Sequence, residues 1–511
     1  MKHRFVKQFL SASVAVAVLF SLAACSNTND LSSGSQTSNG KGGTFVYGVQ
    51  TQPSHLDPYL ATSADTRMIL FNIFEGLVKP DKDGNLRPAV AEKSSISADA
   101  LTYTFQLRKG VKFQNGEDVT AEDVKYSLET AAGLSGGKVL VAELENIRSV
   151  EIADSSTIKI HLKNPDPDFL PYLTTAIVPK GYDKQDTSPI GTGPYSFVSY
   201  TPQQSLVLKK NPYYWQKGLP YLDTVTFKLE SDSNTLLTDL QSGSVDGAAV
   251  ANNVASQLSG DFNIIATNSN SVQMLALNNK AEPFNKVEVR QAVSYAIDPD
   301  AIIETVDFGK GVRCGTPVIP GLKKYFDSSL THAYDRNVQK AKQLLAQAGL
   351  AGGFDMTITV PSNYTVHVDT AQVIVNQLKE VGIRAQIKQV DFATWLSKAY
   401  QNREYQATII SVDGATLSPK SYLGRYVSGN AKNFINYSSA AYDDLYRQAT
   451  EEKDETKRIE LYKKAQQQLS KDAASVFLQD ISNINVFRKE FSGFVSYPLY
   501  VFDASSIKAA G

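Results

Sequence analysis

The sequence predicts an α/β protein with more than one domain. Its 511 residues exceed what one compact hydrophobic core usually holds. Apolar residues make up 42% of the chain, and 25 tyrosines and 23 phenylalanines supply large rings that can fill several cores. In the second half, segments with the period of a helix are interleaved with short segments that alternate every second residue, which is typical of helices packed on a sheet.

The first part of the chain predicts a strand at 44–50 and an apolar helix at 66–78. The sequence DKDGN at 81–85 predicts a hairpin turn. Asp81, Asp83 and Asn85, together with Glu92, match four EF-hand positions, but Leu86 occupies the position where such a loop needs glycine, so we reject calcium.

A strand and a capped helix follow. Residues 102–108 alternate between apolar and polar side chains, which predicts a half-buried strand. The next predicted helix, 121–129, is preceded by Thr120, whose hydroxyl can cap it, and it carries acidic residues in its first turn. Further strands are expected at 156–162, 274–278, 383–387, 405–410 and 475–478, and a closing extended piece at 495–502.

Three segments of the second half carry an apolar stripe at helical spacing, namely 289–297, 338–348 and 374–381. Gly349 and Gly382 end the second and the third of them. A more polar helix is expected at 454–469.

The N-terminal residues have the pattern of an export signal peptide. Three basic side chains precede the apolar run 9–20, which is too short for an ordinary membrane span. The sequence Leu-Ala-Ala-Cys that ends at Cys25 resembles the lipobox of bacterial lipoproteins, which implies cleavage after 1–24 and attachment of several acyl chains, such as palmitate, to the cysteine. A plain secretory signal with an incidental cysteine is the alternative. Residues 25–43 then form a lipidated, flexible tether rich in glycine and serine.

Charge and motif content narrow the function classes. With 51 basic and 52 acidic residues and no basic block, nucleic acid is a poor candidate partner. Once Cys25 is lipidated, Cys314 is the only other cysteine and no disulfide within the chain is possible. A match to the nucleophile pattern Gly-x-Ser-x-Gly at 133–137 follows a helix instead of a strand, so we discount it. The five histidines show no metal or catalytic spacing.

Several ordered motifs resemble one family. Tyr103–Phe113 reads Tyr-Thr-Phe-x-Leu-Arg-x-Gly-Val-x-Phe, and Asn115–Val124 follows with Asn-Gly and then Thr-Ala-x-Asp-Val. Ile190–Tyr195, Asn211–Trp215 and Leu240–Gly247 add Gly-Thr-Gly-Pro-Tyr, Asn-Pro-x-Tyr-Trp and Leu-x-Ser-Gly-x-x-Asp elements. Together they resemble the bacterial extracellular solute-binding proteins of the oligopeptide, dipeptide and nickel type, over nearly all of the chain after the tether.

This resemblance implies a two-lobed fold like that of periplasmic binding proteins, with an extra domain inserted in the first lobe. It predicts a discontinuous first lobe from 44–80, 180–270 and 480–511, with the inserted domain at 81–179. The second lobe is expected at 271–479. A ligand would be enclosed between the lobes, and the closed form would deliver it to the permease subunits of an ABC transporter.

The resemblance also places ligand-binding residues. The segment Ser54, His55 and Leu56 lies within a stretch that lines the family's cleft, although it could be a simple proline-bounded loop. Trp395 is expected on a helix near the cleft, with a core position as the alternative.

The family's amine-anchoring acid aligns with Ala415, after the strand 405–410. Asp413, two residues earlier, could replace this acid because strand residues two apart share a face. The same Asp413 followed by Gly414 could equally be an ordinary turn. The sequence therefore leaves open whether Asp413 anchors the amine of a ligand.

The expected function is that of an extracytoplasmic receptor, held at the cell membrane by lipid on Cys25, that captures an oligopeptide for an ABC importer. A non-peptide solute such as a metal chelate, haem or a sugar is the alternative ligand. An exported hydrolase is the alternative from another class, but no catalytic constellation favours it. We therefore expect no enzymatic activity, no cofactor, no catalytic residue and no resident metal.

Overall fold

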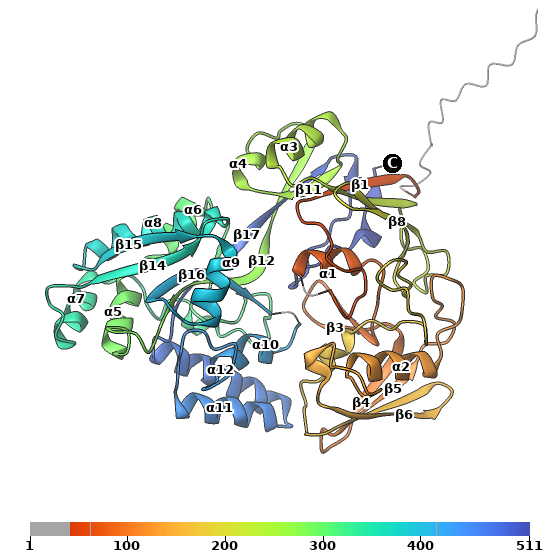
Figure 1. Cartoon of the computed structure of the whole chain (residues 1–511), viewed down its shortest axis with the longest axis horizontal. Helices are drawn as coiled ribbons and strands as arrows, with labels where there is room; N and C mark the ends of the chain where they lie inside the picture. Colours follow the sequence, from red (N-terminus) through yellow and green to blue (C-terminus); the bar gives the residue numbers. More distant parts are fainter. Residues whose placement is uncertain (1–40, 62, 415, 511) are drawn as a thin grey trace, which may run out of the picture. The chain divides into compact units, whose positions relative to one another are not determined.

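A computed structural model describes residues 41–61, 63–414 and 416–510. The predicted signal peptide 1–24, Cys25, all but the last three residues of the tether 25–43, and Ala415 lie outside these residues. The fold is α/β and two-lobed, as the sequence predicted, and one continuous sheet runs through both lobes (Figure 1).

This sheet has ten strands side by side and an eleventh, β13 (Val312–Arg313), paired with one of them. In spatial order the ten are β15 (Arg384–Val390), β14 (Asp355–Pro361), β16 (Ala407–Asp413), β12 (Phe262–Leu277), β17 (Val476–Arg488), β11 (Gly247–Val250), β1 (Thr44–Val49), β10 (Thr224–Leu229), β9 (Ser205–Lys210) and β8 (Tyr195–Thr201).

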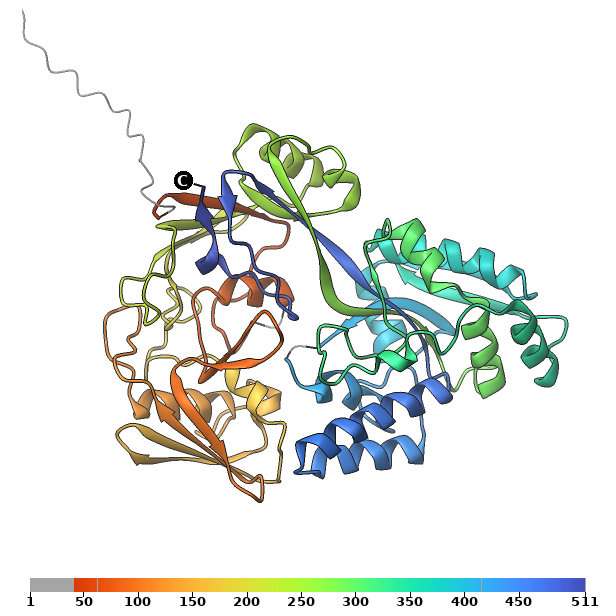
Figure 2. The same cartoon turned by 180° about the vertical axis from the view of Figure 1, so that it is seen from behind.

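The long strands β12 and β17 join the two lobes. They are antiparallel, with Phe262 opposite Arg488 at one end and Leu275 opposite Val476 at the other. In Figure 2 they run side by side, green and blue, between the lobes. Their register shifts between residues 268 and 272, and Asn270 there has a φ of 59°. The crossing is therefore a bulge in a continuous ladder rather than a loose linker. The lobe boundaries expected at 270/271 and 479/480 fall inside these two strands.

The first lobe packs its end of the sheet around aromatic rings. The centroids of Tyr47 and Phe502 are 4.1 Å apart, and Phe45, Phe227 and Phe487 extend the cluster. The lobe also contains α1 (Ala64–Leu70), α3 (Ser233–Ser242), α4 (Asn252–Ala255), η7 (Ala504–Ser506) and the short pair β18 (Phe491–Ser492) and β19 (Lys508–Ala509).

A second, four-stranded antiparallel sheet lies within the first half of the chain (Figure 1). Its order is β4 (Ala91–Ile96), β5 (Thr102–Leu107), β7 (Thr157–Leu162) and β6 (Ile147–Asp154). Around it are α2 (Ala121–Ala131), η2 (Ala142–Leu144), η3 (Leu170–Thr174) and the hairpin β2 (Val78–Pro80) with β3 (Leu86–Pro88).

Local predictions in this region are confirmed. The apolar side chains of β5 are buried, as its alternation predicted. The Thr120 side chain accepts from the Asp123 amide, and the Asp123 carboxylate accepts from the Thr120 amide. This reciprocal capping box satisfies amide groups that the start of a helix otherwise leaves free.

The second lobe covers both faces of its part of the sheet. One face carries α5 (Val287–Ala296), α6 (Pro299–Val306), α7 (Val338–Gln347) and α8 (Thr365–Lys379), and the three predicted apolar stripes lie on α5, α7 and α8. The other face of the sheet is covered by α10 (Pro419–Leu423), α11 (Ala440–Glu451) and α12 (Glu455–Lys471). Short pieces complete the lobe: η4 (Ser328–Leu330), α9 (Phe392–Thr394), the π-helix η5 (Trp395–Gln401) and η6 (Gly424–Tyr426).

Two predictions of extent were wrong. The helix expected at 66–78 ends at Leu70, because the buried Asn72 uses its side chain for tertiary contacts. Its amide nitrogen donates to the carbonyl of Phe502 at 2.8 Å, and its oxygen accepts from the amide of Ala504 at 2.9 Å. The piece expected to be extended at 495–502 belongs to no strand of the described chain.

Candidate ligand-binding site

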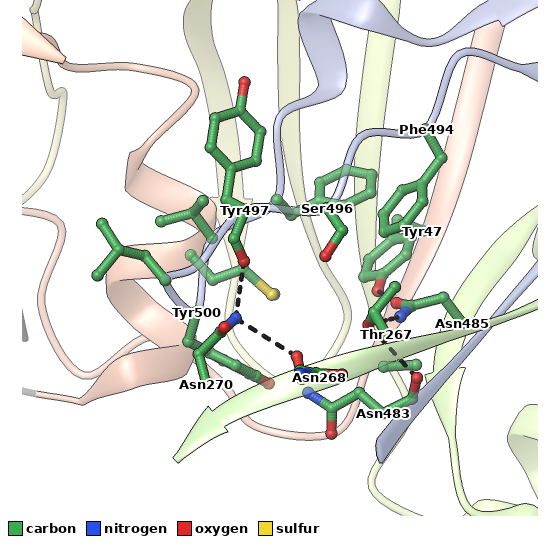
Figure 3. Close-up of a pocket in the computed structure, with 15 residues that line it drawn as sticks. Tyr47, Thr267, Asn268, Asn270, Asn483, Asn485, Phe494, Ser496, Tyr497 and Tyr500 are labelled. Atoms are coloured by element: carbon green, nitrogen blue, oxygen red, sulfur yellow. Dashed lines mark hydrogen bonds between the residues drawn. The ribbon is translucent and has the colours of Figure 1, made fainter. Parts of the chain in front are cut away.

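A pocket lies beside the crossing of β12 and β17 in the first lobe (Figure 3). Side chains from β1, α1, both crossing strands and the C-terminal segment line it. Its polar lining is neutral and consists mainly of amides and hydroxyls, from Thr267, Asn268, Asn270, Asn483, Asn485 and Ser496. Tyr47, Tyr497 and Tyr500 add aromatic walls with a polar end.

Hydrogen bonds hold two of these amides in place. Asn270, at the bulge, donates to the carbonyl of Tyr497 at 2.7 Å. Asn485 donates to the hydroxyl of Thr267 at 3.0 Å. Because an amide side chain offers both donors and acceptors, such a pocket suits neutral polar groups, including the peptide bond.

The predicted segment after β1 lies in a proline-bounded loop. Asp186 holds it: the carboxylate accepts from the Leu56 amide at 2.7 Å and lies 3.1 Å from Nδ1 of His55. Burial alone would raise the pKa of Asp186, but the hydrogen bonds from His55 and the backbone lower it below the usual value. Ser54 and His55 are exposed, whereas Leu56 is buried in the core. Sequence reasoning missed Asp186, because 130 residues separate it from Leu56.

At the edge of the second lobe, three strand ends come together. β14 pairs in parallel with both β15 and β16, so their carboxyl ends share one edge, where α/β sheets commonly bind ligands. Tyr364 follows β14 and Phe392 follows β15, and their rings meet edge to face at 5.8 Å. They are 40% and 39% exposed, which is unusual for large rings. Neither residue was singled out from the sequence.

β16 ends at Asp413 at the same edge, and Gly414 follows it. Asp413 lies opposite Ser271 and is exposed. Gly414 is buried against the ring of Tyr422, which occupies the space that a Cβ atom would need. Ala415 lies outside the described residues.

Trp395 lies within the core of the second lobe. It is 4% exposed, and its indole nitrogen donates to the hydroxyl of Thr408 at 2.8 Å. The ring is therefore packed and hydrogen-bonded without any ligand. Its helix is a π-helix, a rare form that is frequent at functional sites.

Polar contacts connect the region after the four-stranded sheet with the second lobe. Lys420 donates to Asp166 at 2.6 Å. Arg458 and Tyr462 donate to the two oxygens of Asp168 at 2.9 and 2.6 Å. Both acids follow β7, whereas their partners lie on α10 and α12, so these bonds span the lobes.

Within 41–61, 63–414 and 416–510, no three His, Cys, Asp or Glu side chains come together as a metal ion would require. In the same ranges, no helix combines the length and the apolar character needed to cross a membrane.

Comparisons with known proteins agree on one family. Residues 85–434 match the family described as bacterial extracellular solute-binding proteins, family 5 Middle. The glutathione-binding protein GsiB of Escherichia coli K12 is 30% identical over 475 residues, which are 89% of this chain and 92% of that protein.

Two solved structures share the fold. The ABC transporter substrate-binding protein CtaP of Listeria monocytogenes superimposes with a TM-score of 0.83 at 24% identity, covering 92% of this chain and 100% of that one. The periplasmic binding protein DppA of Helicobacter pylori, in complex with the peptide STSA, gives a TM-score of 0.75 at 27% identity, with 92% and 99% covered.

Proposed function

Because the chain belongs to the bacterial extracellular solute-binding proteins of family 5, we propose that it captures an oligopeptide between its lobes and delivers it to an ABC importer. The observation that best supports an oligopeptide as the ligand is the neutral, amide-lined pocket at the crossing of β12 and β17. A peptide presents repeated amide groups, and amide side chains can pair with them whatever the peptide sequence. Relatives named for glutathione and solved with a peptide support the same class of ligand.

In this proposal Asp413 supplies the charge that fixes the amino end of the peptide. Its carboxylate is exposed at the strand-end edge, within reach of a ligand. A peptide with a free ammonium group would bind there more tightly than the same peptide with an acetylated amino end. Only the ammonium can form charge-assisted hydrogen bonds with the carboxylate. The protein binds and releases its ligand without converting it.

The proposed location is outside the cytoplasm, with lipid on Cys25 holding the chain at the membrane. The polar tether after Cys25 would let the lobes move over a distance of about 25 Å while staying near the permease.

A non-peptide solute is the second candidate. It is favoured by the residue at the family's acid position, which is Ala415 in this chain. A ligand without an amine would need no acid there.

Native mass spectrometry of the purified protein tests the proposal first, because a co-purifying peptide would be seen directly. Binding of a synthetic tetrapeptide pool is then compared with the same pool N-acetylated, for the wild type and Asp413→Ala. We expect N-acetylation of the peptides to weaken their binding to the wild type by more than about tenfold. We expect Asp413→Ala to weaken binding of the unmodified peptides by as much. Asp355→Ala is the control, since that exposed acid pairs with Arg384 at the other end of β14. Equal binding of both pools would contradict the amine anchor, and a bound non-peptide solute would contradict the peptide assignment.

A further inference from the structure

The bulge in β12 is built around one buried carboxylate. Where the register shifts, residues 269–271 of β12 stand against Ile481 of β17 alone. Asp480, the residue before Ile481, is fully buried there. Its Oδ1 accepts a hydrogen bond from the hydroxyl of Ser269 at 3.0 Å and one from the backbone amide of Ser271 at 3.3 Å. A bulge interrupts the ladder between two strands, and here a side chain of the partner strand accepts from the interrupted segment.

The same bulge carries residues of the candidate pocket. The side chains of Asn268 and Asn270 line that pocket (Figure 3). The Asn270 side chain donates to the carbonyl of Asn268 at 3.3 Å and to that of Tyr497 at 2.7 Å. Hydrogen bonding from the Asn270 backbone and the Asn268 side chain also acts on the carboxyl group of Asp480. One buried acid is therefore linked to both of the amides that the bulge presents to the pocket.

The donors around Asp480 match an ionised carboxylate. A backbone amide can donate but cannot accept, so it pairs better with a carboxylate than with a neutral acid, whose protonated oxygen is itself a donor. An asparagine at this position would likewise turn donor hydrogens toward these amides. The negative charge therefore favours the observed shape of the bulge.

Several titratable groups that face Asp480 keep one charge state near neutral pH. Tyr422 of α10 and Cys314, which follows β13, interact electrostatically with Asp480, and burial raises the pKa of both well above the neutral range. His367 is joined through one amide side chain to Gln479, the neighbour of Asp480, and burial lowers the pKa of this histidine to about 4. Burial raises the pKa of Asp480 itself to about 7, so this acid changes its charge close to neutral pH.

The charged groups on the other adjacent elements have different partners or lie at the surface. Arg313 of β13 pairs with two surface acids. Asp413 is exposed at the end of β16. Asp307, which follows α6, accepts hydrogen bonds from the amide and the hydroxyl of Ser482 at 2.7 Å each, and burial raises its pKa. Asp307 is thus a second buried acid beside β17, bonded outside the bulge.

We propose that Asp480 is a positioning residue for the ligand: its carboxylate orders the bulge so that Asn268 and Asn270 face the captured peptide. This inference rests on the proposed capture of a peptide in the pocket at the crossing of β12 and β17. The ionised form matches the donors of the bulge, so the peptide-bound protein favours the carboxylate, and binding releases a proton from Asp480 to the solvent. The affinity for the peptide therefore falls as pH drops through about 7.

The test measures binding of the unmodified tetrapeptide pool to the full-length protein by isothermal titration calorimetry at about pH 5.5 and about pH 8. At the higher pH, Asp480→Asn should bind the pool about tenfold more weakly than the wild type, since hydrogen bonds to a charged group contribute about this factor. At the lower pH the two should bind alike, because the wild-type acid is then protonated. Ser269→Ala removes one donor, so it should cause a smaller loss at the higher pH and add nothing in the double variant with Asp480→Asn.

Asp307→Asn is the matched control, because it replaces a buried acid that bonds to β17 outside the bulge. It should keep the wild-type dependence of binding on pH. The melting temperature separates positioning from stabilisation: at about pH 8, Asp480→Asn should melt no lower than the wild type, because it removes a buried charge. Hydrogen–deuterium exchange of residues 262–277, measured without peptide, should be faster in Asp480→Asn.

Three results would overturn the role of Asp480. They are equal binding by the wild type and Asp480→Asn at the higher pH, an unchanged exchange rate of the bulge, and a parallel loss of binding and melting temperature. A pool that does not bind the wild type would contradict the proposed capture of a peptide. The exchange measurement, which needs no ligand, would then decide whether Asp480 orders the bulge.

Discussion

The carboxylate of Asp168 accepts a hydrogen bond from Nε of Arg458 at 2.9 Å across 290 residues of sequence. The side chains are 4% and 8% exposed, and the second oxygen of Asp168 accepts from Tyr462. Asp168 follows β7 of the four-stranded sheet, whereas Arg458 lies on α12 of the second lobe. A nearly water-free ion pair therefore connects the end of the four-stranded sheet with α12 of the second lobe.

Breaking this pair should loosen the contact between the lobes. Asp168→Leu leaves the Arg458 charge buried without its acid, which typically costs about 3–5 kcal/mol. We expect a lower melting temperature and, in small-angle scattering, a larger radius of gyration. The double variant Asp168→Leu with Arg458→Met should recover much of the stability. Asp355→Leu, which removes an exposed acid, is the control and should change stability little. A double variant as unstable as the sum of the single ones would contradict this account.

Asp480 should make stability depend on pH. Burial raises its pKa to about 7, against the opposing effect of hydrogen bonds from the Ser269 hydroxyl and the Ser271 amide. The folded state therefore holds a proton that the unfolded chain releases near pH 4, so the contribution of Asp480 to stability is lost as pH rises from about 4 to 7. The difference in melting temperature between Asp480→Asn and the wild type should grow in favour of the variant from pH 5 to 8. A difference that stays constant over this range would show that Asp480 does not titrate there.

Gly414 should tolerate no side chain. The ring of Tyr422 fills the place of a Cβ atom, and Tyr422 is itself 1% exposed, so neither group can move freely. Gly414→Ala should destabilise the protein by about 1–3 kcal/mol and weaken ligand binding. Thermal unfolding and peptide binding are the measurements. Gly352→Ala is the control, because nothing lies within 4 Å of the atom it adds. Equal stability of the two variants would contradict the packing argument.

The proposed anchor is tested by labelling cells with a palmitate analogue. Cys25→Ala should abolish the label and leave the protein uncleaved or released into the medium, since no other residue would carry the lipid. Cys314→Ala should keep the label, because Cys314 is buried in the second lobe. Label that survives in Cys25→Ala would refute lipidation at this residue.

The sequence by itself determined those elements whose signals are local. Thr120 and Asp123 stand three residues apart, so the start of α2 could be read from the chain alone, and the capping box confirms it. The apolar stripes of α5, α7 and α8 were equally readable, because one face of each helix must be buried wherever the helix packs.

The tertiary structure decided what depends on distant partners. Only the end of β12 and the start of β17 were predicted, since residues 262–273 are mostly polar and become a strand by pairing with a segment about 215 residues away. Helix α1 stops at Leu70 because Asn72 bonds to residues near the C-terminus. Asp168 and Arg458 stand 290 residues apart, and only the tertiary structure brings them together.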